Sequence, residues 1–270
     1  MSSSSTFLAT QGERYERTMG RWSRQLALPF LDFVGTADGN RVLDVGCGTG
    51  HLAFAVARRS GAGEVRGIDL AQPYIEHARR HNQDPRIVFD VADACALPFP
   101  ERSFDRVLSL LVLHFVPKAD QAIAEMLRVT RPGGVVAAAV WDARGGFVAN
   151  RMFFDTAAAL DPNAGERRAR NYTRPLTRPG ELQRAWLNAG LKNVAETTLV
   201  MRMEFASFTD YWTPYEGNEG PGAEYVAGLS EVERGRLRDA VQAAYLDGDE
   251  DGPRSYAALA WAVKGTRPVT

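Results

Sequence analysis

The sequence of 270 residues has few of the features that mark specialised classes of protein. Two cysteines, Cys47 and Cys95, are too few for the disulfide framework of a secreted domain, and they predict free thiols in the cytoplasm. No charge of one sign dominates, since 32 Lys and Arg stand against 33 Asp and Glu. The longest apolar run, 107–116, is about half of the roughly 20 residues that a membrane span requires. These absences indicate a cytoplasmic protein without a membrane span.

The net charge of −1 also bears on the partners of the protein. Proteins that bind nucleic acid non-specifically neutralise its phosphates with an excess of Lys and Arg, which this sequence lacks. The basic cluster at 167–170 is typical of a solvated surface. We therefore expect a small-molecule partner rather than nucleic acid. We also expect no metal site, because His77 and His81 have a suitable helical spacing but no third ligand that converges on them.

The first 35 residues read as a polar tail followed by an amphipathic helix. The serine-rich segment 1–10 lacks the cationic and apolar regions of a signal peptide, which predicts a frayed tail. From 15 to 34 apolar residues recur every three to four positions. This spacing predicts a helix, interrupted at Gly20 and kinked near Pro29.

Short apolar runs alternate with amphipathic segments between residues 41 and 141. The predicted strands are at 41–45, up to Asp69, at 86–91, at 107–111 and at 135–141, and the predicted helices are at 51–60, 72–81 and 120–129. Continuous apolar runs of this kind are typical of parallel strands that helices cover on both faces. The pattern therefore predicts a doubly wound α/β sheet.

The pattern changes after Trp141. The predicted elements are a helix at 147–160, a charged stretch at 166–170 before a proline-containing loop, a helix at 181–189, an extended run at 194–205 and a closing strand at 255–264. A mixed loop and helix insertion at 208–246 is rich in aromatic residues. Its Tyr211, Trp212 and Tyr215, with Glu216, are either the core of this insertion or walls of a ligand pocket, because small-molecule sites have aromatic walls with few polar groups. Trp141 is a further candidate for such a wall.

A glycine-rich turn follows the first predicted strand, with the order Gly46-Cys47-Gly48-Thr49-Gly50. Glycine permits positive φ and lets a ligand lie against the main chain. The helix behind the turn presents free amide groups and the positive end of its dipole, so the turn can hold the polar end of a nucleotide-like ligand. The pattern alone is ambiguous, because residues 48–53 also satisfy the dinucleotide-binding form G-x-G-x-x-A.

Acidic residues recur at the carboxyl ends of three predicted strands. Asp44 lies near the end of the first strand, Asp69 ends the second and Asp93 follows the third. A carboxylate at Asp69 can accept both hydroxyls of a ribose, and one at Asp93 can accept from an exocyclic amine of adenine. Either residue alone is also a plausible helix cap. Together with the glycine turn they favour ligand contacts at the sheet edge where open α/β sheets bind ligands.

The stretch from 42 to 141 resembles class I S-adenosylmethionine-dependent methyltransferases, in the group of the ubiquinone/menaquinone-biosynthesis and other small-molecule methyltransferases. The matching segments are Asp44–Gly50, Asp69, Asp93-Ala94, Leu97–Pro100 with Ser103–Asp105, and Arg131–Gly134. The resemblance implies a Rossmann-like, seven-stranded, mostly parallel sheet whose last strand, 255–264, runs antiparallel beside the fifth. It also implies transfer of a methyl group from S-adenosylmethionine to a small organic acceptor by in-line displacement.

The resemblance further implies which residues contact the cofactor. They are Arg21 at its carboxylate, Asp44 and Gly46 at its ammonium, Cys47, Gly48 and Gly50 in the turn, Asp69 at the ribose, Leu70, Asp93 and Ala94 at the adenine, and Leu110 at the methionyl part. The segment 15–23 resembles one that lies over the cofactor in a bacterial branch of the family. The chain then divides into a tail and lid helix at 1–35, a cofactor-binding core at 36–142 and an acceptor-side region at 143–270. The last of these contains a helical lid insertion at about 206–250.

His114 is the candidate catalytic residue, because it follows the fourth strand on the side where a methyl acceptor must sit. A neutral imidazole there can remove a proton from the acceptor, although a packed histidine that bonds the backbone fits the same position. Cys47 and Cys95 have no neighbouring base that would make them nucleophiles. Two other functions stay open at this point. One is an NAD(P)-dependent oxidoreductase that uses the shifted glycine pattern, and the other is a non-catalytic S-adenosylmethionine-binding module.

Overall fold

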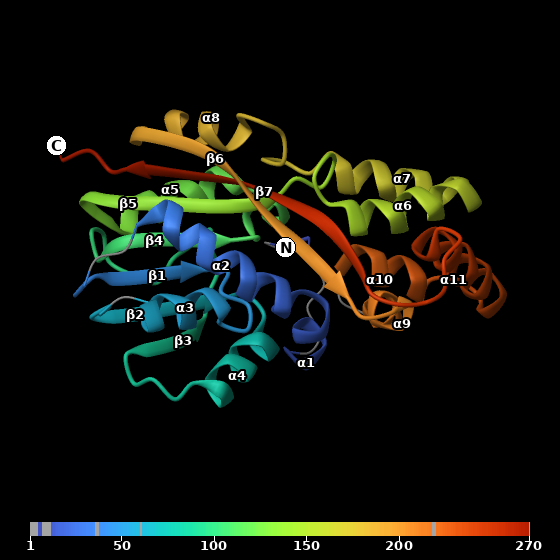
Figure 1. The fold of residues 1–270 in the computed structure, drawn as a ribbon. Helices are drawn as coiled ribbons and strands as arrows, with labels where there is room; N and C mark the ends of the chain where they lie inside the picture. The colour runs from blue at the N-terminus through green and yellow to red at the C-terminus, as the bar shows by residue number, and fades with distance from the viewer. Residues whose placement is uncertain (1–4, 7–11, 36–37, 60, 218–219, 270) are drawn as a thin grey trace.

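The computed structural model describes residues 5–6, 12–35, 38–59, 61–217 and 220–269. A seven-stranded sheet forms its centre, with the strand order β3-β2-β1-β4-β5-β7-β6 (Figure 1). The strands are β1 (Arg41–Val45), β2 (Glu64–Asp69), β3 (Ile87–Val91), β4 (Phe104–Leu110), β5 (Thr130–Trp141), β6 (Lys192–Phe205) and β7 (Arg254–Thr266). Strands β1 to β5 run parallel, whereas β7 pairs antiparallel with both β5 and β6. The predicted seven-stranded, mostly parallel sheet with an antiparallel last strand beside the fifth is confirmed.

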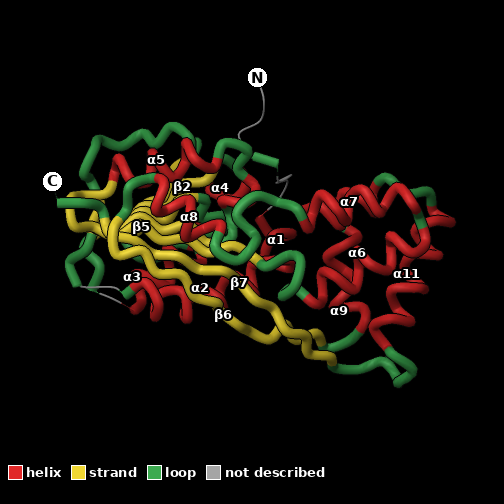
Figure 2. Tube along the Cα trace, turned by 90° about the horizontal axis from the view of Figure 1, so that it is seen from above, coloured by secondary structure: helices red, strands yellow, loops and turns green. Residues whose placement is uncertain are grey.

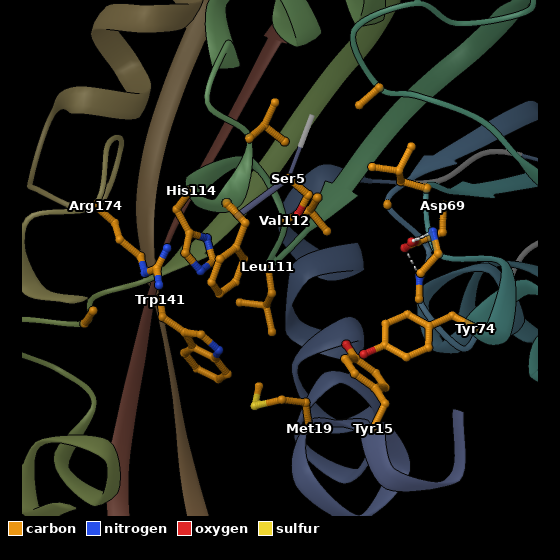
Figure 3. Close-up of a pocket in the computed structure, with 18 of the residues that line it drawn as sticks. Ser5, Tyr15, Met19, Asp69, Tyr74, Leu111, Val112, His114, Trp141 and Arg174 are labelled. Carbon is orange, nitrogen blue, oxygen red and sulfur yellow. Dashed lines mark hydrogen bonds between the residues drawn. The ribbon is translucent and has the colours of Figure 1, made fainter. Parts of the chain in front are cut away.

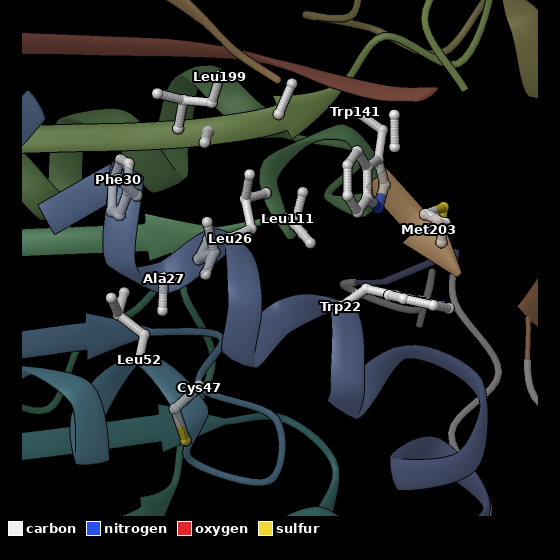
Figure 4. Packing of buried hydrophobic residues seen from close by; sticks show 14 of the residues in the cluster. Trp22, Leu26, Ala27, Phe30, Cys47, Leu52, Leu111, Trp141, Leu199 and Met203 are labelled. Atoms are coloured by element: carbon white, nitrogen blue, oxygen red, sulfur yellow. The ribbon is translucent and has the colours of Figure 1, made fainter. Parts of the chain in front are cut away.

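Successive residues of a strand point to opposite faces of the sheet, and here the side chains on both faces are apolar. Helices therefore cover both faces. The covering helices are α2 (Arg21–Val34), α3 (His51–Arg59) and α4 (Gln72–His81) on one face, and α5 (Ala119–Val129) and α8 (Glu181–Asn188) on the other. In β1, Val42 belongs to the core beneath α2 and α3, while its neighbour Leu43 belongs to the core beneath α5 and α8. Figure 4 shows the first core, where Leu26 of α2 points toward the sheet and Ala27 lies beside Leu52 of α3.

The N-terminal helical segment runs from Gly12 to Val34 and changes type on the way. Helix α1 (Gly12–Tyr15), a π-helical turn η1 (Glu16–Gly20) and α2 follow one another without a break. The helix predicted for 15–34 is confirmed, and the change of helix type at Gly20 falls where an interruption was predicted. Of the tail predicted for 1–10, residues 1–4 and 7–10 lie outside the described part of the chain. Thr6 lies inside it, and its N–H donates to the carbonyl of Phe115 at 2.9 Å.

The long strands β6 and β7 extend past the sheet and carry a helical unit beyond its edge (Figures 1 and 2). This unit comprises α6 (Val148–Leu160), α7 (Pro162–Tyr172), α9 (Phe208–Trp212), η3 (Thr213–Glu216), α10 (Gly220–Ala227) and α11 (Glu231–Leu246). Its core is aromatic: the rings of Phe153 and Tyr215 stack at 4.0 Å between centroids, and Tyr211 and Trp212 are buried. No helix in the described ranges is long and apolar enough to cross a membrane.

Helix α7 is the element that the sequence pattern missed. The charged stretch at 166–170 was predicted to come before a proline-containing loop, and such a loop follows at 173–180, but no helix was predicted and the stretch itself lies inside α7. The helix begins with a capping signal, because the side chain of Asp161 accepts from the N–H of Asn163 and Pro162 occupies the first helical position. Its only buried residues are Ala164 and Asn171, which are too few to show an apolar periodicity.

Candidate functional site

A cavity of about 380 Å³ lies at the carboxyl ends of the parallel strands. This size lies within the range of roughly 300–1,000 Å³ that is typical of small-molecule sites. Figure 3 shows Asp69, Tyr74 and Tyr15 at one end of the cavity, and His114, Trp141 and Arg174 at the other. The two ends therefore differ in charge, since the first holds a carboxylate and the second a guanidinium.

The glycine turn forms part of the cavity wall through Gly46 and Gly48. The amides of Gly46 and Cys47 donate to the carbonyl of Ile68 at 2.7 and 2.8 Å, which ties the turn to β2. Gly46, Gly48 and Gly50 have φ values of +73°, +54° and +95°. A Cβ at Gly46 would lie 2.5 Å from Val112, and one at Gly50 would lie 2.7 Å from Phe89. The turn therefore requires glycine both for its backbone conformation and for its packing.

Asp69 joins the glycine turn to the end of β2. One carboxylate oxygen accepts from the N–H of Gly48 and the other from the N–H of Ala71, each at 2.9 Å. A carboxylate has about four acceptor positions, so both oxygens retain capacity for a ligand. Burial raises the pKa of Asp69, against the effect of these backbone hydrogen bonds. The neighbouring Leu70 also lines the cavity and is 44% exposed, which leaves an apolar surface for a flat ring.

Asp44 is buried next to the turn, and only one of its two carboxylate oxygens has a hydrogen-bond partner among the described residues. Its Oδ2 accepts from the N–H of Ala53 at 3.1 Å, whereas Oδ1 has no hydrogen-bond partner among the described residues. Burial raises the pKa of Asp44 to about 8, and the charge of Asp69 adds to this shift. A buried carboxylate oxygen without a partner is costly. Asp44 therefore suits a ligand that brings a cation or a hydrogen-bond donor to this end of the site.

The third acidic residue and its neighbour also face the cavity. Asp93 and Ala94 line it, and Asp93 accepts from the N–H of Cys95 at 2.8 Å, which shapes the loop after β3. Leu110 does not line the cavity, but the next residue, Leu111, does. Leu111 has φ of +65°, uncommon for a residue with a Cβ, and its N–H donates to Ala139 at 2.7 Å. No pattern in the sequence distinguishes Leu111 from Leu110, because the turn after β4 is set by pairing with β5.

Arg21 lies elsewhere than the resemblance implied. Its Nη1 donates to both carboxylate oxygens of Asp210 at 3.0 Å, and its guanidinium lies over the ring of Trp22 at 4.2 Å. Arg21 does not line the cavity; nor do Cys47 and Gly50. Arg21 is drawn away from the cavity by Asp210 on α9, a partner that lies 189 residues later in the chain. The ion pair uses Nη1 alone, and Nε and Nη2 of Arg21 are buried without a hydrogen-bond partner among the described residues.

Hydrogen bonds of Glu16 attach the N-terminal helical segment to the glycine turn and to the helix that follows it. The carboxylate of Glu16 accepts from Thr49 Oγ1 at 2.5 Å and lies 2.8 Å from His51 Nε2. Burial raises the pKa of Glu16, but these two hydrogen bonds outweigh it and lower the pKa below its ordinary value. These hydrogen bonds hold the segment in a position in which Tyr15 and Met19 line the cavity. The structure thus brings part of the 15–23 segment to the site that it was expected to cover.

His114 lies at the opposite end of the cavity, in the short 3-10 helix η2 (Leu113–Phe115) after β4. Burial and then the charge of Arg174 lower the pKa of His114 to about 3, so its imidazole is neutral at physiological pH. Its Nδ1 is buried and has no partner in the described chain. Trp141 at the end of β5 also lines the cavity. By contrast Tyr211, Trp212 and Tyr215 do not line it, and they form the core of the helical unit.

The sequence reasoning missed the residues of α6, of α7 and of the loop after α7 that complete this end of the cavity. They are Asn150, Asn171 and Arg174, together with Phe147 before α6. Asn171 Nδ2 donates to Asn150 Oδ1 at 2.9 Å, which joins the two helices. Asn150 lies in the segment predicted as a helix at 147–160, while Asn171 and Arg174 follow the charged stretch at 166–170, and no pattern in the sequence marks these three residues as cavity residues.

Comparison with known proteins agrees with this geometry. Residues 42–134 match the family described as a methyltransferase domain. The methyltransferase GfsG of Streptomyces halstedii is 42% identical over 105 residues, which cover 37% of this chain and 37% of the relative. The demethylmenaquinone methyltransferase of Renibacterium salmoninarum is 41% identical over 115 residues, which cover 42% of this chain and 45% of the relative. The sequence matches thus span less than half the length of either relative.

The fold likeness extends further along the chain than the sequence likeness. The structure of the YcgJ protein of Bacillus subtilis has a TM-score of 0.59 and 18% sequence identity, and the match covers 90% of this chain and 98% of that protein. A match over 90% of this chain extends well beyond residues 42–134.

Proposed function

We propose that the protein is a class I methyltransferase that transfers a methyl group from S-adenosylmethionine to a small organic acceptor, and the match of residues 42–134 to a methyltransferase domain supports this. The observation that carries the proposal is the unpartnered oxygen of buried Asp44 beside the glycine turn and Asp69. S-Adenosylmethionine brings an ammonium, a sulfonium and two ribose hydroxyls together. The acidic end of the cavity offers partners to the ammonium through Asp44 and to the ribose hydroxyls through Asp69.

Each cofactor group has residues that suit it. Asp44 and the carbonyl of Gly46 suit the ammonium, directly or through water, and Asp69 suits both ribose hydroxyls. Leu70 covers one face of the adenine, and Asp93 accepts from its amine. Cys47, Gly48 and Gly50 shape the turn, Ala94 suits the adenine, and Leu111, rather than the predicted Leu110, suits the methionyl part. Arg21 remains the proposed partner of the cofactor carboxylate, in a conformation in which its guanidinium is separated from Asp210.

The bound cofactor supplies an activated methyl group, and the protein mainly aligns the reactants and excludes water. Alignment of this kind contributes about 7–11 kcal/mol to a displacement reaction. Leu111, Trp141 and Phe147 give the acceptor end apolar walls, which favour water exclusion. His114 lines the cavity with a neutral imidazole, and its Nδ1 has no hydrogen-bond partner among the described residues. It holds the acceptor's nucleophilic group by a hydrogen bond and takes the proton released on methylation.

The shifted glycine pattern of a dinucleotide-binding oxidoreductase is not favoured. That pattern needs its second glycine, Gly50, to approach the ligand. In the structure Gly50 faces the ring of Phe89 instead, while Gly46 and Gly48 line the cavity.

The division into a lid helix at 1–35, a core at 36–142 and an acceptor-side region at 143–270 is part of the proposal, as are a location in the cytoplasm and the absence of a nucleic-acid partner.

Calorimetric titration with S-adenosylmethionine, S-adenosylhomocysteine and NAD⁺ tests the proposal. We expect both S-adenosyl compounds to bind and NAD⁺ not to bind. Binding of NAD⁺ without either S-adenosyl compound would reverse the assignment. Mass spectrometry then follows the formation of S-adenosylhomocysteine over a panel of small hydroxyl, amine and carboxylate acceptors. Tight cofactor binding without turnover on any acceptor would favour a non-catalytic binding module.

A further inference from the structure

The end of the cavity opposite Asp69 holds a positive charge without an acidic partner in the described chain. Arg174 lines the cavity there, in the loop after α7. Its Nε donates to Asn171 Oδ1 at 3.4 Å and its Nη1 to Thr6 Oγ1 at 3.2 Å. Its guanidinium lies 4.5 Å from the centre of the Phe115 ring. These partners are all neutral, so none of them balances the charge.

Burial makes this arrangement costly in the protein alone. It lowers the pKa of Arg174, because the charged form loses hydration. Glu224 is the acidic residue whose charge acts on Arg174, but Glu224 forms its own ion pair with Arg167 at 3.4 Å. A half-buried guanidinium with neutral contacts retains N–H groups for an anion.

Two further polar atoms at the same end have no partner among the described residues. They are Nε1 of Trp141 and Nδ1 of His114, and each residue is only 4% exposed. Both side chains line the cavity beside Arg174 (Figure 3). The indole N–H is only a donor, and a neutral imidazole donates or accepts according to its tautomer. Arg174 and Trp141 therefore present donors at this end of one cavity.

We propose that this end of the cavity binds the anionic group of the methyl acceptor, a carboxylate held by Arg174 and Trp141. The inference rests on the proposed function, since it names the chemical class of the acceptor at the same site. The body of the acceptor is apolar, because Leu111 and the rings of Trp141 and Phe147, 4.9 Å apart between centroids, form the adjoining wall. The acceptor is thus a small carboxylic acid with an aromatic or aliphatic body.

The cofactor has a carboxylate of its own, which is a second source of the same chemistry. The acceptor's carboxylate is favoured by position. Arg174 lies with Trp141 and His114, whereas Asp69 and the glycine turn, which suit the cofactor, line the other part of the cavity (Figure 3). The two sources differ in one measurable respect. An arginine that serves the cofactor carboxylate affects cofactor binding when no acceptor is present.

Benzoate and benzamide are suitable probes, because they share a shape and differ in charge. Calorimetric titration into the protein saturated with S-adenosylhomocysteine is expected to show benzoate binding at least tenfold more tightly than benzamide. Arg174→Gln is expected to reduce this preference to less than twofold. Arg178→Gln is the matched control, since Arg178 follows in the same loop, is exposed and lies outside the cavity. It is expected to retain the preference.

Each other outcome has a distinct meaning. Equal binding of the two probes by the unaltered protein overturns the proposal. So does a tenfold loss of S-adenosylhomocysteine affinity in Arg174→Gln without a probe, which assigns the guanidinium to the cofactor. If that variant does not fold, Trp141→Phe keeps an aromatic side chain but removes the indole N–H, and it is expected to lower the preference severalfold. An unchanged preference refutes the proposal. Failure of the proposed function is separate: the protein then does not bind S-adenosylhomocysteine, while an Arg174-dependent preference for benzoate is still measurable without it.

Discussion

Replacement of Asp44 by Asn is expected to stabilise the protein and to weaken its binding of S-adenosylmethionine. Burial raises the pKa of Asp44 from 3.8 to about 8. The folded state therefore holds this proton more tightly than the unfolded state, and the stability of the protein falls as pH rises from about 4 to about 8. At pH 7, which is about three pH units above 3.8, the loss of stability is roughly 4 kcal/mol.

An asparagine at position 44 does not incur this penalty. Its carbonyl oxygen can accept from Ala53 as Oδ2 does now, while its amide group takes the place of the unpartnered Oδ1. An unsatisfied buried donor costs about 1–3 kcal/mol, so a net gain of about 1–3 kcal/mol remains at pH 7. The gain is expected to shrink by roughly 3 kcal/mol between pH 7 and pH 5, because the wild-type penalty decreases by about 1.4 kcal/mol per pH unit.

Chemical denaturation at pH 7 and pH 5 measures this difference, and calorimetry measures cofactor affinity. We expect Asp44→Asn to be more stable at pH 7, to lose that advantage at pH 5 and to bind S-adenosylmethionine at least tenfold more weakly. Asp239→Asn, on the exposed side of α11, is the control and is expected to change neither property. If Asp44→Asn is less stable at pH 7 by an amount that does not depend on pH, then Asp44 is ionised and paired, and the reasoning fails.

Three further substitutions test other parts of the site. Asp69→Ala is expected to weaken S-adenosylmethionine binding about tenfold or more, since charged hydrogen bonds contribute about 1.5–3 kcal/mol; unchanged affinity in calorimetry removes Asp69 from the site. His114→Ala is expected to retain cofactor affinity and to reduce turnover, and the rate of the unaltered enzyme is expected to show no titration of His114 between pH 5 and 7, because the pKa of this residue is about 3. Gly46→Ala is expected to destabilise the fold by more than about 1 kcal/mol in denaturant titrations, because its Cβ would lie 2.5 Å from Val112 at φ of +73°. A stability equal to wild type contradicts the rigidity of the turn.

The sequence was sufficient to predict most of the cofactor half of the fold. Strand β1 (Arg41–Val45) and helix α4 (Gln72–His81) begin and end at the predicted residues. Each predicted strand in this half is a short apolar run, and most of these strands are followed by a helix, so the information lies close together along the chain. The acidic residues at the strand ends share one edge because parallel strands place all their carboxyl ends there.

The region after Trp141 could be predicted only in outline. The sequence showed the aromatic residues Tyr211, Trp212 and Tyr215 but left their place open between a core and a pocket wall. The structure places them in a core with Phe153 of α6, which lies about 60 residues earlier in the chain. Periodicity does not encode such distant pairings, because it reports only which face of an element is apolar.

The sequence by itself determined the class of fold, the glycine turn and the acidic residues that suit the cofactor, since these depend on local backbone preferences and on strand order. The tertiary structure alone decided which side chains reach the cavity. It paired Arg21 with Asp210, 189 residues away, and it brought Arg174 beside His114. Both results follow from how the helical unit packs on the sheet. The acceptor end of the site, unlike the cofactor end, is therefore built from contacts between distant segments.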